Sequence, residues 1–126
     1  MNADVAALKR LIRLPAEVQR CEWQTGKRAE HDGDWWVAAV LAVGAEQMGA
    51  FLAGAPEKTL FETPPGLQLA SSFAALKSLP DAQVVDGRVR VVADVHDAAP
   101  YRSSPLVNGQ AIRLSATEVL VLLWTQ

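Results

Sequence analysis

Two short clusters combine the two histidines of this chain with carboxylates: His31-Asp32-Gly33-Asp34 and Asp94-Val95-His96-Asp97. Imidazole and carboxylate groups bind divalent transition metals, and two histidines with one carboxylate form the facial triad of non-haem iron sites. Aspartate and glycine near strand ends are also ordinary turn residues, so we favour turn and solvation roles, with no bound metal or cofactor. The alternative function is a small metal-dependent enzyme whose ligands come from His31, Asp32, Asp34, His96 and Asp97.

Nucleophilic catalysis has little support in the sequence. Cys21 is the single cysteine and falls on the inward face of a predicted strand, beside Trp23, so we expect it to be buried as a small hydrophobe. Ser103 and Ser104 lie in a loop, but no Gly-x-Ser-x-Gly elbow accompanies them. No glycine-rich phosphate loop is present either. A non-enzymatic protein is therefore favoured.

Trp35 and Trp36 are adjacent, so on a strand their side chains point to opposite faces. One can pack beneath helices, while the other needs a separate cover. Because tryptophan and tyrosine are enriched among interface anchors, we expect an exposed aromatic patch. In the alternative, Trp36 packs against Trp124 beneath the side chain of Arg113. The predicted binding residues are Trp35, Trp36, Tyr101, Arg102 and Trp124.

Two apolar runs, at 34–43 and 117–125, are expected to position these residues. Each has the length of a strand, is rich in β-branched or aromatic residues, and lacks polar alternation. Such strands need cover on both faces, so we expect them at the centre of one sheet. Residues 17–25 alternate between polar and apolar and predict a half-buried strand, which forms an antiparallel hairpin with the first run.

The other predicted elements follow from turn and capping signals. Asp86-Gly87 predicts a hairpin between strands at 82–85 and 88–95. In the second strand apolar and charged residues alternate, which predicts one buried and one exposed face: Val89, Val91, Ala93 and Val95 alternate with Arg88, Arg90 and Asp94. Another strand is expected around Arg113. Helices are expected at 3–14, 45–53 and 67–79, with Asn2 as the first N-cap. The proline-containing segment 55–66 is expected to be a surface connection, and 96–109 a long loop.

Strands and helices in separate runs indicate the α+β class. We predict a single domain over residues 1–126, with a mainly antiparallel sheet of about six strands and about three helices packed mostly on one face. One cysteine cannot form an internal disulfide, so the hydrophobic core must stabilise the fold.

Composition limits the partners. A net charge of −2 gives no case for nucleic acid, and no apolar run approaches the roughly 18 residues of a membrane span. The first residues lack the order of a signal peptide, which makes the cytoplasm the default, although a trimmed leader would leave the same sequence. Frequent alanine and an excess of arginine over lysine resemble bacterial proteins with GC-rich coding. The sequence therefore predicts a small non-enzymatic bacterial protein-binding domain, of inhibitor, immunity or adaptor type, whose partner is another protein or a second copy.

Overall fold

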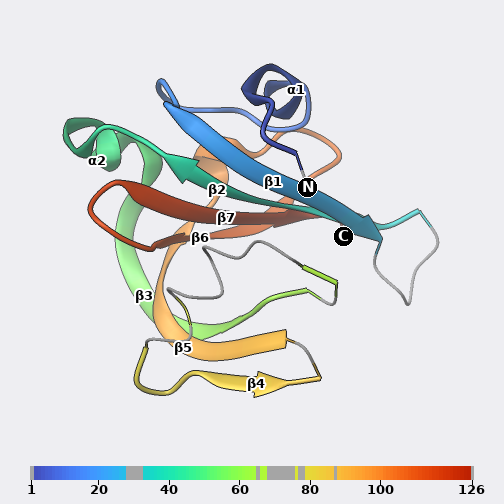
Figure 1. Cartoon of the computed structure of the whole chain (residues 1–126), viewed down its shortest axis with the longest axis vertical. Coiled ribbons are helices and arrows are strands. Elements are labelled where there is room, and N and C mark those ends of the chain that lie inside the picture. The colour runs from blue at the N-terminus through green and yellow to red at the C-terminus, as the bar shows by residue number, and fades with distance from the viewer. Residues whose placement is uncertain are drawn as a thin grey trace.

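The computed structural model describes residues 2–27, 33–64, 66, 67, 76, 79–86 and 88–125. These residues form one seven-stranded antiparallel sheet (Figure 1). Two α-helices and two 3-10 helices are described over their full lengths. The strands are β1 (Arg20–Lys27), β2 (Trp35–Ala42), β3 (Ala53–Glu62), β4 (Gln83–Val85), β5 (Arg88–Asp97), β6 (Asn108–Arg113) and β7 (Glu118–Trp124). The helices are α1 (Val5–Lys9), η1 (Ala45–Gln47), α2 (Met48–Phe51) and η2 (Ala99–Tyr101).

The sheet follows the order β1-β2-β7-β6-β5-β3, and β4 also pairs with β5. Strand β5 therefore has three partners: β3 along its length, β4 at residues 88–90 and β6 at residues 95–97. Figure 1 shows β3 and β5 bending, so that their lower halves and β4 lie beneath β7 and β6 in this view. The bend gives the sheet a concave face on its inner side and a convex face on its outer side.

Strands β2 and β7 confirm the prediction drawn from the two apolar runs. They pair antiparallel, from Trp36 opposite Trp124 to Ala42 opposite Glu118. Every residue of β2 after Trp35 is buried. Both faces are covered: the bent sheet, together with Leu67 and Leu76, covers the concave side, and helices cover the convex side.

Each face of the sheet carries its own core. On the convex side α1, α2 and η2 pack against β1, β2 and β7, and the largest side chains that these helices bury are Leu8, Phe51 and Tyr101. On the concave side β5 contributes Val89, Val91, Ala93 and Val95. These four alternate with more exposed residues, as the sequence predicted for this strand.

Helix α1 is shorter than the predicted helix at 3–14, and its N-cap is Asp4 rather than Asn2. The Asp4 carboxylate accepts hydrogen bonds from the backbone N–H groups of Ala6 and Ala7. Asn2 instead exchanges two backbone hydrogen bonds with Trp23 on β1. After Lys9 the backbone N–H groups of Arg10 and Leu11 bond to carbonyls three residues back, and the N–H of Arg13 bonds to the carbonyl of Tyr101, outside the helix.

The prediction of a surface connection at 55–66 is wrong, because most of this segment belongs to strand β3. Its first residues, which include Gly54 (φ +63°) and Pro56, form a register shift against β5. Proline is tolerated there because β3 is an edge strand of the sheet. From Glu57 onward the pairing with β5 is regular.

The two other predicted helices had different outcomes. The segment 45–53 is helical only through η1 and α2, and it ends at Phe51. Most of the segment 67–79 lies outside the described residues. The helices that are described over their full lengths pack on the convex side, whereas Leu76, which has helical conformation, is buried in the concave core.

Candidate interaction surface

Trp36 and Trp124 are neighbours on the concave face. They are cross-strand partners and belong to the same core, in which Trp36 is only 3% exposed. Gly26 leaves room for the Trp36 indole, because a Cβ atom at Gly26 would lie 2.5 Å from Trp36 Cε2. Among the described residues Trp36 Nε1 has no hydrogen-bond partner. Trp36 is therefore a core side chain and cannot act as an exposed anchor in this conformation.

Trp35 and Tyr101 belong to the core on the convex face. Tyr101 is fully buried, its ring centroid lies 6.3 Å from that of Phe51, and its hydroxyl donates to the Phe51 carbonyl. Trp35 packs partly buried against the same core. Arg102 is exposed, and its guanidinium pairs with the Asp97 carboxylate at 2.9 Å. The predicted binding residues therefore lie on opposite faces of the sheet and do not form one aromatic patch.

The buried phenol of Tyr101 gives a pH-dependent prediction. Burial raises the pKa of Tyr101 above its ordinary value of 10.0, so the native state keeps a proton that the unfolded chain releases. The free energy of unfolding should therefore fall as the pH rises above that value. Tyr101→Phe removes this term, and it also costs about 1–3 kcal/mol at neutral pH, because the buried Phe51 carbonyl loses its donor. Urea unfolding at a series of alkaline pH values measures both effects, and equal pH slopes for the two proteins would contradict the assignment.

The residues of the metal-site alternative are engaged with other parts of the protein. Asp34 accepts a hydrogen bond from the Thr125 hydroxyl, and Asp97 accepts from the Ala99 N–H and from Arg102. Nδ1 of His96 lies 3.3 Å and 3.2 Å from the carbonyl oxygens of Ala53 and Gly54. Among the described residues no three His, Cys, Asp or Glu side chains are grouped to hold a metal ion. The remaining two candidates, His31 and Asp32, lie outside the described residues.

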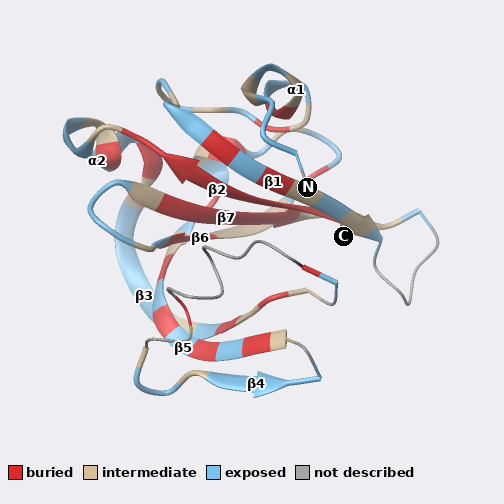
Figure 2. Cartoon of the chain, viewed as in Figure 1, coloured by how far each residue is buried: buried red, intermediate tan, exposed pale blue. Residues whose placement is uncertain are grey.

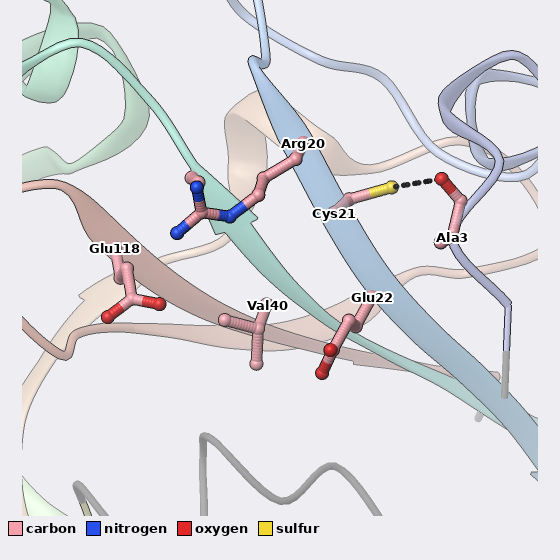
Figure 3. A pocket seen from close by; sticks show the side chains of 7 residues that line it. Ala3, Arg20, Cys21, Glu22, Val40 and Glu118 are labelled. Atoms are coloured by element: carbon pink, nitrogen blue, oxygen red, sulfur yellow. Dashed lines mark hydrogen bonds between the residues drawn. The ribbon is translucent and has the colours of Figure 1, made fainter.

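A pocket of about 370 Å³ lies beside β1, and its side chains do not form a nucleophilic site (Figure 3). The buried Cys21 points toward Ala3, with Sγ 3.8 Å from the Ala3 carbonyl oxygen, and away from the Arg20 guanidinium. Burial, followed by the nearby carboxylates, raises the pKa of the Cys21 thiol and so disfavours a thiolate. The lining residues are Ala3, Arg20, Cys21, Glu22, Val40, Ala42 and Glu118.

The convex side of β3 and β5 exposes large apolar side chains. Leu60 and Val92 are cross-strand partners and are 48% and 45% exposed. Their neighbours Phe61 and Val91 point to the concave core and are buried. Figure 2 shows the resulting alternation of buried and exposed bands along β5.

Charged residues flank this apolar pair on both sides along the strands. On one side Lys58 lies opposite Asp94, with Nζ 4.0 Å from the carboxylate. On the other side Glu62 lies opposite Arg90 and pairs with it at 3.0 Å; Arg88 pairs with Glu62 at 2.8 Å. We call the three cross-strand pairs the β3–β5 outer surface: Lys58, Leu60, Glu62, Arg90, Val92 and Asp94.

This surface was not predicted from the sequence, because the segment that forms β3 was predicted to be a surface connection. Leu60 and Phe61 are adjacent, and on any strand one of two adjacent apolar residues must face away from the other. Trp35 and Trp36 alternate in the same way, but there the bent sheet, together with Leu67 and Leu76, supplies the second cover. At residues 60 and 61 the alternation indicates one exposed apolar residue.

No protein-family model, curated protein or solved structure matches this chain. In the part of the chain that the structure describes, every helix is too short or too polar to cross a membrane.

Proposed function

We propose that this chain is a non-enzymatic protein-binding domain whose contact surface is the β3–β5 outer surface. The observation that carries the proposal is the exposure of Leu60 and Val92 side by side on a paired, regular part of the sheet. Scattered single apolar residues are normal on protein surfaces, whereas contiguous apolar patches rimmed by polar residues mark interaction sites.

The charged rows give this surface specificity. An apolar centre contributes binding energy through burial, and flanking charges select a partner by electrostatic complementarity. The suitable partner is a protein face that has apolar side chains at its centre and the opposite charges in its flanking rows. An inhibitor, immunity protein or adaptor would act by such a contact.

The metal-dependent alternative has no observation in its favour among the described residues. His96 and Asp97 are held by protein groups, and the cysteine is buried as a thiol. The protein-binding role is therefore the function that the described geometry supports best.

A photoreactive side chain at position 60 tests the proposal in cells that make the protein. We expect covalent adducts with another polypeptide from position 60 and none of the same adducts from position 107. Val107 is the matched control, because it is an exposed valine (44%) that does not belong to the β3–β5 outer surface. No adduct at position 60, or the same adducts from both positions, would overturn the proposal.

A further inference from the structure

The β3–β5 outer surface has a repeating arrangement of charge. Read in one direction, β3 presents a cation, an apolar residue and an anion: Lys58, Leu60 and Glu62. The residues opposite them on β5 are an anion, an apolar residue and a cation: Asp94, Val92 and Arg90. The cross-strand ion pairs Lys58–Asp94 and Glu62–Arg90 therefore have opposite orientations on either side of the apolar row, and Arg88 adds a second cation beside Glu62.

This arrangement matches itself under a two-fold rotation. If two copies meet face to face about an axis along the strands, Lys58 lies over Asp94 of the other copy and Glu62 over Arg90. If the axis runs across the strands, Lys58 lies over Glu62 and Asp94 over Arg90. In both cases opposite charges meet and apolar residues cover one another, which is the self-complementarity that a two-fold interface requires.

We infer that the β3–β5 outer surface binds a second copy of this chain, an inference that rests on the proposed protein-binding function. The suitable partner described above has an apolar centre and opposite charges in its flanking rows. The β3–β5 outer surface itself has both properties. Association closes at two copies, because a two-fold contact uses the same surface on both molecules.

The size of the surface sets the strength of the dimer. From Lys58 to Glu62 the surface extends about 14 Å along the strands, at roughly 3.4 Å per residue, and it is two strands wide. A stable interface covers about 800 Å² on each partner, more than these six residues provide. The dimer is therefore weak, and its population rises with protein concentration.

Analytical ultracentrifugation over a range of concentrations tests this inference. We expect the mass of the purified chain to rise from 13.6 kDa toward twice that value as the concentration increases. Leu60→Glu should raise the dissociation constant at least about tenfold, because each copy would bring a charge into the apolar row. Val107→Glu should associate like the wild type, since it adds the same charge outside the surface.

Two charge variants distinguish electrostatic pairing from non-specific association. Lys58→Glu with Arg90→Glu makes the four side chains of the two rows negative, and Arg88→Gln, made in the same variant, removes the second cation that pairs with Glu62, so dimerisation should be lost about either axis. The exchange Lys58→Asp, Asp94→Lys, Glu62→Arg, Arg90→Glu and Arg88→Glu reverses each of these charges and keeps the opposite orientation of the two rows, so it should still dimerise. Circular dichroism checks that each variant is folded, which we expect because the side chains are on the surface.

Three results would overturn the inference: a wild type that stays monomeric at every concentration, a Leu60→Glu variant that associates like the wild type, or an all-negative variant that does so. A monomeric wild type whose position 60 still forms adducts with a different protein would overturn the dimer and leave the protein-binding function standing. Absence of both dimer and adducts would overturn both.

Discussion

Replacing Trp36 by alanine is expected to lower the free energy of unfolding by about 3–5 kcal/mol, the range found when a large buried aromatic side chain is removed from a core. Trp36 is almost fully buried between Gly26 and the concave core, so its removal leaves a cavity that the paired strands cannot close. Urea denaturation followed by far-ultraviolet circular dichroism measures the loss.

Trp35→Ala is the matched comparison. It also replaces a tryptophan of β2 by alanine, but Trp35 is only half-buried. We expect a clearly smaller loss of stability for Trp35→Ala than for Trp36→Ala. If Trp36→Ala were as stable as the wild type, the indole would have to be exposed, and the assignment of this side chain to the core would be wrong.

Gly109→Ala is expected to have the second large effect, a loss of about 3 kcal/mol or more. A Cβ atom at Gly109 would lie 2.7 Å from the Leu122 carbonyl oxygen and 2.8 Å from Ala98 Cβ, and it would also overlap a methyl group of Leu123. Two of these neighbours are a backbone oxygen and a Cβ atom, which cannot move aside without a shift of the backbone. The loss in the free energy of unfolding should therefore lie at the upper end of the range for overpacked cores.

Gly49→Ala provides the control for this prediction. Gly49 lies in α2, where a Cβ atom would meet no other atom within 4 Å. Alanine is also preferred to glycine in a helix, so this variant should match or slightly exceed the wild type in thermal unfolding. Equal melting temperatures for the two variants would contradict the close approach of β6 to its neighbours.

The centre of the fold could be predicted from the sequence because its signals are local. Long apolar runs without alternation indicated β2 and β7 as buried strands, and they are adjacent in the sheet. The Asp86-Gly87 pair indicated the hairpin, in which Asp86 has a positive φ of 52°. Alternating valines indicated the buried face of β5.

The candidate site could not be predicted, because it depends on contacts between distant residues. Strand β3 begins with a proline and a left-handed glycine, which in the sequence are typical of a loop. Its pairing with β5 joins residues that are 38 positions apart at Glu57–Val95 and 28 positions apart at Glu62–Arg90. The burial of Trp36 has the same origin, since the bend that brings β5 beneath β7 is a property of the whole sheet.

Two edges of the sheet, at β3 and β1, carry features that hinder uncontrolled growth. At one rim, Pro56 has no amide hydrogen to donate and the register shift beside it interrupts the regular edge of β3, while Lys58 places a charge there. At the other rim, Asn2 occupies the backbone groups of Trp23. At these positions another extended chain meets a missing donor, an interrupted register or occupied backbone groups, which hinders the endless stacking of strands that amyloid fibres require.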